Sequence, residues 1–354
     1  MSAVHLVLGS GAKDAEYLAV EALCARYGLR VVSDDRAHGD RIPPDYLSEC
    51  DIVLANLRKR EIGEPDFRVI FELGIAHARR KKLYGYMPDS RDYIHRYPYG
   101  FLGKHGLPMD QYGLRYTTAR TLGNLMYSVP TKIVSGGPDA CVRMIYYDWI
   151  EQCKQRGQRI TPQQDLRFSR GWQPGDAHLA YLAGYECFYP NDKEIGESMV
   201  RLCRRNGFAA DYPTSPIDGL REVDFADLMN PLVGIGASFD HVQYKVLLSD
   251  ITIANMNPYH GLLPDSGTVF ELGMAAGLGQ LCVCFYHERK DVLREQMPKN
   301  HGWLIDARQY DPDAYAQRLH KLFGTDTAYV RGDFPDAVRY VRRVLKSMNM
   351  ERTK

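Results

Sequence analysis

Cysteine is sparse, charge is balanced and long apolar runs are absent from this chain, and each of these features excludes a class of protein. The 354 residues include only eight cysteines and no Cys-x-x-Cys pair. That is too few for a disulfide scaffold, so we expect reduced thiols in a cytoplasmic protein. Lysine and arginine total 45 against 44 for aspartate and glutamate, a formal net charge of +1. This balance argues against a nucleic-acid partner.

Membrane spans, signal peptides and metal sites are also not predicted. No apolar run approaches the roughly 18 residues that a transmembrane helix needs. The opening residues, MSAVH, have no basic flank followed by an apolar core, so we expect no signal peptide. The 11 histidines show no metal-ligand spacing. What remains is a globular composition, 45% hydrophobic and 25% charged, in a chain long enough for two domains.

The chain contains an internal repeat. The segment beginning at Asp51 reads DIVLANLRKREIGEPDFRVIFELGIAHA, and the segment beginning at Asp250 reads DITIANMNPYHGLLPDSGTVFELGMAAG. They share eleven identities without a gap, which indicates a duplicated unit. Upstream, HLVLGS matches AYLAGY when Gly9 is placed over Gly184. The second copy then has extra residues, which we expect as loop within 213–240 because that stretch is rich in Pro, Gly and Asp.

Short apolar runs alternate with helical patterns in both halves. The expected strands are 4–10, 29–34, 51–57, 81–87, 131–137, 178–184, 208–213, 250–256 and 281–287, and the expected helices are 14–27, 69–80, 139–155, 194–205, 268–279 and 313–323. This alternation predicts α/β domains with doubly wound parallel sheets, flavodoxin-like or Rossmann-like. We expect one domain at 1–155, a linker at 156–176 and a second domain at 177–354. Their ligands would lie beyond the carboxyl ends of the strands, where the strand order reverses.

Two carboxylates in the segment PDSGTVFELG of the second half are candidates for chemistry. Asp265 precedes the predicted helix, and Glu271 would fall in its first turn, where free N–H groups and the helix dipole favour an ionised carboxylate. Paired carboxylates in different environments are what glycosidic bond chemistry uses. The alternative is a capping box, in which Glu271 returns a hydrogen bond to a capping Thr268.

The first half keeps the same carboxylate spacing. Asp66 and Glu72 are six residues apart, as in the second copy, but Phe67, Arg68 and Val69 replace the Ser-Gly-Thr segment that contains the capping threonine. A carboxylate pair that persists without its capping partner favours a shared ancestral site over a capping role.

Three segments of the second half resemble the signature of the nucleoside 2-deoxyribosyltransferase family. They are YLAG at 181–184, DITIANMNPYHG at 250–261 and PDSGTVFELGMAAGLGQ at 264–280. In that family a glutamate attacks C1′ of a deoxynucleoside, the base departs, and a second base attacks the deoxyribosyl ester, so two inversions give net retention. The resemblance implies no cofactor, and it implies deoxynucleosides and free purine or pyrimidine bases as partners.

The resemblance also implies residue roles. Glu271 matches the nucleophile, Asp265 the carboxylate that handles the base proton, and Tyr181 the tyrosine that orients the nucleophile. The expected contacts to sugar and base are Ser266, Gly267, Thr268, Gly184, Phe188 and Asn255. Phe188 fits a core position equally well.

The first half departs from this pattern. Leu6 stands in the place of Tyr181, so Asp66 and Glu72 mark a degenerate site. Yet Asn124-Leu125-Met126 resembles the family segment whose asparagine reaches into the neighbouring subunit to hold the 5′-hydroxyl. We therefore predict a covalent pseudo-dimer with one composite site, which Asn124 completes. The alternative is that Asn124 only caps or turns the chain.

The main interpretation is a base-exchanging transferase, and two others remain open. One is an N-glycosidase that hydrolyses nucleosides or nucleotides, and the other is a non-catalytic nucleotide-binding or sensor protein. A nucleotide substrate would need extra Ser, Arg or Lys near Ser266, and Lys245 is one residue whose place only a structure can give. Val242 fills the position that holds a base-contacting Asp or Asn in many members, so base preference is not predicted. Further association of fused pairs into an oligomer is compatible with the resemblance.

Overall fold

The computed structural model describes residues 3–7, 14–32, 46–58, 65–88, 101–102, 108–109, 123–155, 178–189, 191–215, 234–259, 262–287, 310–324 and 326–352. The linker expected at 156–176 lies outside these ranges. Within them, no helix is both long and apolar enough to cross a membrane.

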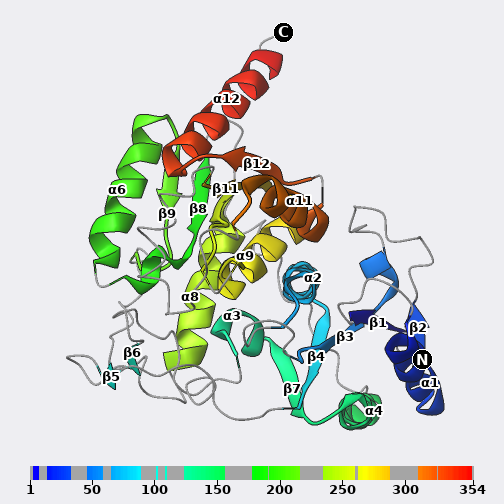
Figure 1. Cartoon of the computed structure of the whole chain (residues 1–354). Coiled ribbons are helices and arrows are strands. Elements are labelled where there is room, and N and C mark those ends of the chain that lie inside the picture. Colours follow the sequence, from blue (N-terminus) through cyan, green and yellow to red (C-terminus); the bar gives the residue numbers. More distant parts are fainter. Residues whose placement is uncertain are drawn as a thin grey trace.

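The first half is a five-stranded parallel sheet with helices on both faces (Figure 1). Its elements are β1 (Ala3–Val7), α1 (Ala15–Arg26), β2 (Arg30–Val32), the 3-10 turn η1 (Tyr46–Glu49), β3 (Ile52–Asn56), α2 (Phe67–Ala78), β4 (Lys82–Met87), the small hairpin β5 (Phe101–Leu102) and β6 (Pro108–Met109), α3 (Leu125–Ser128), β7 (Thr131–Ser135) and α4 (Pro138–Gln155). The strand order is β2-β1-β3-β4-β7.

The second half repeats this architecture. Its elements are β8 (Leu179–Ala183), the 3-10 turn η3 (Tyr185–Phe188), α6 (Asp192–Arg205), β9 (Ala209–Asp211), α8 (Gly234–Leu248), β10 (Ile251–Asn255), α9 (Ser266–Gly277), β11 (Leu281–Tyr286), α11 (Pro312–Phe323), β12 (Ala328–Arg331) and α12 (Phe334–Arg352). Its sheet runs β9-β8-β10-β11-β12, all parallel, which is the order of the first sheet. In both, the order reverses between the first and third strands, β1 and β3 or β8 and β10, which is where such sheets bind ligands.

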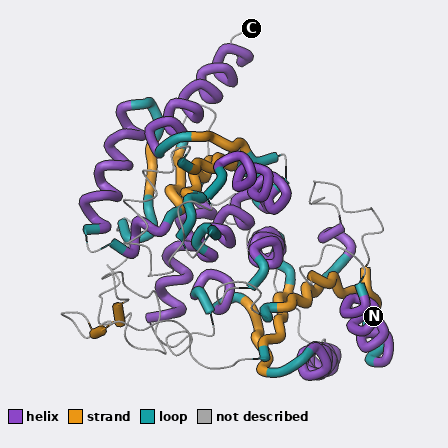
Figure 2. Tube along the Cα trace, viewed as in Figure 1, coloured by secondary structure: helices purple, strands orange, loops and turns teal. Residues whose placement is uncertain are grey.

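The two halves pack through α2 and α9, which lie between the sheets (Figures 1 and 2). The contact is reciprocal. A Cβ atom added to Gly74 would lie 2.2 Å from the carbonyl oxygen of Phe270, and one added to Gly273 would lie 2.2 Å from the carbonyl oxygen of Phe71. Equivalent residues thus make equivalent contacts, as at a two-fold interface. The predicted pseudo-dimer of tandem doubly wound domains is confirmed.

One large hydrophobic core is built by both halves, and two others each belong to one half. The shared core joins the inner faces of both sheets to α2 and α9. A second core lies between the first sheet and α1 and α4, and a third lies between the second sheet and α6 and α12. Because successive strand residues point to opposite faces, each strand supplies both the shared core and one of the other two cores.

The predicted strands and helices are confirmed in type, with shifts of a few residues at their ends. The extra loop was expected within 213–240, where residues 216–233 lie outside the described ranges and α8 begins at Gly234. The strand β12, which completes the second sheet, was not predicted. The domain limits themselves stay a prediction.

Candidate functional site

The candidate site lies where β8 and β10 end and α9 begins. Tyr181 comes from β8, while Asp265 and Glu271 come from the start of α9. All three side chains are buried, with 0%, 4% and 6% of their surface exposed. They interact, because the charge of Asp265 raises the pKa of Glu271 and the Tyr181 hydroxyl lowers it. The structure thus brings the three predicted catalytic residues together.

Glu271 is held in a setting that disfavours its charge. Burial raises its pKa well above the usual value, and the Asp265 carboxylate adds to the effect. One expectation was wrong, because Glu271 lies in the second turn of α9, which begins at Ser266, rather than in the first. It therefore lies beyond the first turn, whose N–H groups are free.

Two buried hydroxyl groups at the site have no hydrogen-bond partner among the described residues. These are the Oη of Tyr181 and the Oγ of Ser266. The Tyr181 hydroxyl interacts with Glu271 without meeting the distance and angle of a formed hydrogen bond. A buried hydroxyl without a partner is costly in a protein interior. A polyhydroxylated ligand such as a sugar would supply the missing partners.

Asp265 is anchored by Thr268. Its Oδ2 accepts hydrogen bonds from the main-chain N–H of Thr268 at 2.8 Å and from the Thr268 hydroxyl at 2.9 Å. Asp265 is therefore the N-cap of α9, and the capping box with Thr268 as the cap was wrong. Asp66 caps α2 in the same way by accepting from the main-chain N–H of Arg68. Capping thus explains the persistence of the aspartate in both halves, which the sequence argument had attributed to an ancestral site alone.

Asn124 reaches this site from the first half. Its Nδ2 donates to Oδ1 of Asp265 at 3.4 Å. The approach depends on Gly267, because a Cβ atom at that position would lie 2.9 Å from Asn124 Nδ2 and 3.0 Å from Oδ1. Asn124 is also the N-cap of α3, where its Oδ1 accepts from the main-chain N–H of Met126 at 3.0 Å. Asn124 therefore both caps α3 and approaches the site, and its contact with a sugar stays a prediction.

A third carboxylate, Glu186 on η3, belongs to the same cluster and was not predicted. Asn255, at the end of β10, donates from Nδ2 to Glu186 Oε1 at 2.8 Å. Gly184 makes room for it, since a Cβ atom there would lie 2.0 Å from Glu186 Oε2. Burial and the charge of Asp265 raise the pKa of Glu186. The predicted positions Gly184 and Asn255 thus hold a carboxylate that strand and helix patterns alone do not single out.

Phe188 belongs to an aromatic cluster next to the site. Its ring lies 5.6 Å from that of Tyr259, which stacks at 4.9 Å on Tyr185. Phe188 is only 9% exposed. The cluster favours the core interpretation of Phe188 over a direct contact with the base.

The equivalent site in the first half is closed by an ion pair. Oε1 of Glu72 accepts from Nε of Arg68 at 3.0 Å, and Oε2 lies 3.5 Å from Nε2 of His5. Burial alone would raise the pKa of Glu72, but the hydrogen bond and charge of His5 and the charge of Arg68 outweigh it and lower that pKa. Arg68 is the counterpart of Gly267 on the paired helix. The first half therefore has a cationic side chain, Arg68, where the second half has a glycine that Asn124 approaches.

The residue that replaces Tyr181 was assigned wrongly from the sequence. In the second sheet Tyr181 pairs with Thr252, and in the first sheet His5 pairs with Val53, the counterpart of Thr252. The true counterpart of Tyr181 is therefore His5. Leu6 points to the opposite face, into the core beside α1 and α4. The alignment of Gly9 on Gly184 was one residue out of register, and such a slip exchanges the two faces of a strand.

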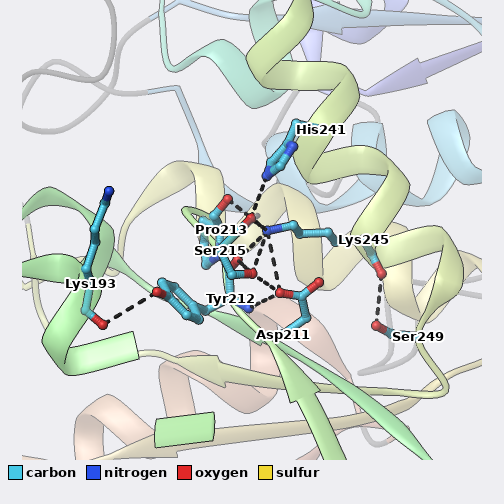
Figure 3. A network of polar contacts seen from close by, with 8 residues as sticks. All are labelled: Lys193, Asp211, Tyr212, Pro213, Ser215, His241, Lys245 and Ser249. Carbon is cyan, nitrogen blue, oxygen red and sulfur yellow. Dashed lines mark hydrogen bonds and ion pairs between the residues drawn. The ribbon is translucent and has the colours of Figure 1, made fainter. Parts of the chain in front are cut away.

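Lys245 on α8 is fully engaged in a network beside the site (Figure 3). Its Nζ is 1% exposed and donates to the carbonyl oxygen of Tyr212 at 2.7 Å and to the Ser215 hydroxyl at 2.8 Å, with Oδ1 of Asp211 at 3.5 Å. Burial lowers the pKa of Lys245 to about 8, and Asp211 opposes this. Because β9 pairs Asp211 with Tyr181, the network fixes the strand next to the site. The same contacts engage the Nζ of Lys245, which was one candidate for binding a 5′-phosphate.

Within the described part of the chain, no group of three or more His, Cys, Asp or Glu side chains is arranged to hold a metal ion.

The family model for nucleoside 2-deoxyribosyltransferase matches residues 40–126 and 180–315 of this chain. Among solved structures, a 2-desoxiribosyltransferase from Leishmania mexicana is 19% identical, with 41% of this chain and 97% of that chain covered and a TM-score of 0.26. A conserved protein from Enterococcus faecalis V583 is 18% identical, with 48% and 99% covered and a TM-score of 0.29. These two likenesses are too slight to add to the argument. No curated protein matches the chain in a direct comparison.

The family model therefore matches in both repeats, and the two matched segments together make up more than half of the chain. They contain every residue of the candidate site described above. The chain belongs to the nucleoside 2-deoxyribosyltransferase family, as a tandem duplication of the family's domain.

Proposed function

We propose that the protein exchanges the base of a 2′-deoxynucleoside through a covalent deoxyribosyl ester on Glu271, with net retention of configuration. One observation carries the proposal. Of the two glutamates at equivalent helix positions, Glu271 interacts with Tyr181 and forms no ion pair with a residue that the structure describes, while Glu72 lies within ion-pair distance of Arg68 and His5. A nucleophile has to be free of an ion pair to attack C1′, so the second half carries the reaction.

The environment of Glu271 suits a nucleophile. A carboxylate that burial has stripped of water is more reactive, and the rise in its pKa reports that loss of solvation. The Tyr181 hydroxyl, which has no other partner among the described residues, would donate to one oxygen of Glu271 and leave the second directed at the sugar. The first inversion releases the base and forms the ester, and the second transfers the deoxyribosyl group to the incoming base.

The remaining residues would hold the sugar. Ser266 supplies an unpartnered hydroxyl, while Asp265, fixed by Thr268, and Asn124 supply a carboxylate and an amide on one side. Gly267 keeps that side open. Because Asn124 comes from the first half, the proposed site is composite, and the first half acts by completing it.

The burial of the site favours exchange over hydrolysis, the second candidate. Glu271 and Asp265 are 6% and 4% exposed, and an ester formed in so closed a place is shielded from water until a base arrives. A sensor without activity would have no use for an unpaired, desolvated glutamate, which costs stability. The occupied Nζ of Lys245 supports a nucleoside rather than a 5′-nucleotide.

The proposed partners are thus small molecules, a deoxynucleoside and a free base. A reducing, cytoplasmic setting fits the seven described cysteines, all of which are free thiols. A base-exchange assay tests the activity. Wild-type protein receives a deoxynucleoside with and without adenine, hypoxanthine or cytosine, and the products are separated by chromatography. We expect a new deoxynucleoside that forms only with the acceptor base. Release of free base regardless of the acceptor would instead identify a hydrolase.

A further inference from the structure

Glu186 is a third carboxyl of the proposed site, and its two oxygens differ. Oε1 accepts the Asn255 amide at 2.8 Å, whereas no side chain of the described residues donates to Oε2. Glu186 is partly exposed while Asp265 and Glu271 are buried. Its interaction with Asp265 places it in the same cluster. The main-chain N–H of Glu186 itself also interacts with the carboxylate. Glu186 is therefore a carboxyl with a single side-chain donor among the described residues, and it is less buried than Asp265 and Glu271.

Asp265 is poorly suited to carry a proton to or from the base. Its two oxygens accept from the Thr268 N–H, the Thr268 hydroxyl and the Asn124 amide. It also caps α9, where the helix dipole favours negative charge. All of these contacts favour the carboxylate, and protonation would break at least one of them. The geometry thus fits a fixed anion.

The α8 side of the site does not supply a base contact either. Val242 packs against the shared core. Its neighbour His241 contacts the carbonyl oxygen of Ser215, and Gln243 contacts His77 of the first half. A proton carrier for the base has to come from another element.

The first half provides an internal comparison for Glu186. There Asn56 donates to Oε1 of Glu16 at 3.0 Å, and the Tyr86 hydroxyl donates to the same oxygen at 3.0 Å. Strand register makes Phe285 the counterpart of Tyr86, because Asn56 pairs with Tyr86 and Asn255 with Phe285. Phenylalanine has no hydroxyl to donate. The second half therefore lacks a counterpart of the Tyr86 hydroxyl, which is the second donor to the Glu16 carboxylate in the first half.

We propose that Glu186 is the carboxyl that exchanges a proton with the nucleobase, which deepens the proposed function and rests on it. In the first step, the Glu271 oxygen forms a bond to C1′ as the C1′–N bond breaks. The electron pair of that bond stays on the base nitrogen, which takes the proton of Glu186. In the second step, a nitrogen of the incoming base attacks C1′, the ester bond to Glu271 breaks, and the proton of that nitrogen returns to Glu186. Burial and the charge of Asp265 raise the pKa of Glu186, and the Asn255 amide and the main-chain N–H of Glu186 oppose this rise. A raised pKa favours the protonated form that the first step uses.

A leaving-group comparison tests this role. Single turnovers are measured with a deoxynucleoside and with p-nitrophenyl 2-deoxyribofuranoside, whose nitrophenolate leaves without a proton. We expect Glu186→Gln to slow the deoxynucleoside by about 100-fold or more, the usual worth of general acid catalysis. The burst of nitrophenolate should stay within roughly threefold of wild type, because Glu271 still attacks. The matched control is Glu16→Gln, which removes the carboxyl that Asn56, the counterpart of Asn255, binds in the first half. It should change neither rate.

Two results would overturn the role of Glu186. One is an equal loss with both substrates in a Glu186→Gln protein of unchanged melting temperature, which would make it a positioning residue. The other is that Asp265→Asn, instead of Glu186→Gln, slows the deoxynucleoside but keeps a normal rate with the nitrophenyl substrate. That result would make Asp265 the residue that exchanges the proton. If wild-type protein turned over neither substrate, the transferase proposal itself would fall, and that outcome is distinct from the other two.

Discussion

The amide nitrogen of Asn124 lies 3.4 Å from the carboxylate of Asp265, so a residue of the first half contacts the site of the second. The same asparagine caps α3 through its other side-chain atom. A fused pair in which one site is closed by Arg68 can still need both halves. In the proposed reaction, the first half contributes the amide of Asn124, and the second half contributes the carboxylate that attacks the sugar. The following predictions separate these contributions.

The two functions of Asn124 can be separated by substitution. Serine caps helices well but has no amide, so Asn124→Ser should keep the stability of the protein while kcat/KM falls about tenfold, which corresponds to about 1.4 kcal/mol of lost transition-state binding. Asn124→Ala should lose the same activity and, in addition, about 1 kcal/mol of stability. Deoxynucleoside kinetics and thermal unfolding measure the two effects. Unchanged kinetics in both variants would leave Asn124 as a cap alone.

We expect a side chain at position 267 to lower activity by displacing Asn124. Its Cβ position lies 2.9 Å from the Asn124 amide, so Gly267→Ala is expected to displace that amide and lower kcat/KM about tenfold or more. In an Asn124→Ala background the same change should have little effect, because the displaced group is gone. Gly137→Ala is the control, since nothing lies within 4 Å of its Cβ position. Additive losses in the double variant would contradict the contact.

The two equivalent glutamates should respond to pH in opposite ways. The folded state raises the pKa of Glu271 above its usual 4.5, so the wild-type protein loses stability as pH rises above that value through the raised pKa. Glu271→Gln should therefore melt higher than wild type at neutral pH, with the gain vanishing below about pH 4.5.

Glu72 contributes stability above its usual pKa, and this is lost as pH falls through its lowered folded value. Glu72→Gln should thus melt at a lower temperature than wild type at neutral pH. The expected loss in the free energy of unfolding is roughly 1–3 kcal/mol, as for a broken buried interaction. Thermal unfolding of both variants between pH 4 and 8 checks the pair. Shifts of the same sign at neutral pH would be inconsistent with the opposite environments.

Any side chain at Gly74 or Gly273, where α2 and α9 come closest, should destabilise the protein. Added Cβ atoms at Gly74 and Gly273 would lie 2.2 Å from main-chain oxygens, which cannot move as a flexible side chain can. Each alanine substitution is expected to destabilise the protein by about 1–3 kcal/mol or more. It should also lower activity, because the two halves would shift apart and withdraw Asn124. Chemical denaturation, with Gly137→Ala as the reference, measures the loss; a neutral effect would contradict the close packing.

Much of the fold could be predicted from the sequence, because apolar strands alternating with helices and a gapless repeat specify two equivalent sheets. The family resemblance implied that Tyr181, Asp265 and Glu271 would lie together and that Asn124 would approach them. What failed depended on single-residue detail. One residue of slip placed Leu6 where His5 lies, because a strand's side chains alternate between its two faces.

The electrostatics of the site could not be read from the chain. The pKa of Glu271 depends on its burial and on the proximity of Asp265, and both depend on packing between the halves. Glu186 could not be predicted from the sequence because its side-chain partner among the described residues, Asn255, is 69 residues away. No periodic pattern links a residue in a 3-10 turn to the end of a strand so distant in sequence.

The central claim is a single nucleophile, Glu271, in a chain with two homologous glutamates. It is tested most directly by trapping the covalent intermediate. A 2′-deoxy-2′-fluoroarabinosyl nucleoside slows breakdown of the ester by destabilising the oxocarbenium-like transition state, and intact mass spectrometry followed by peptide mapping locates the sugar. The account predicts one sugar per chain, on Glu271, absent in Glu271→Ala and unaffected in Glu72→Ala. A sugar on Glu72, two sugars per chain, or turnover that survives in Glu271→Ala would contradict it.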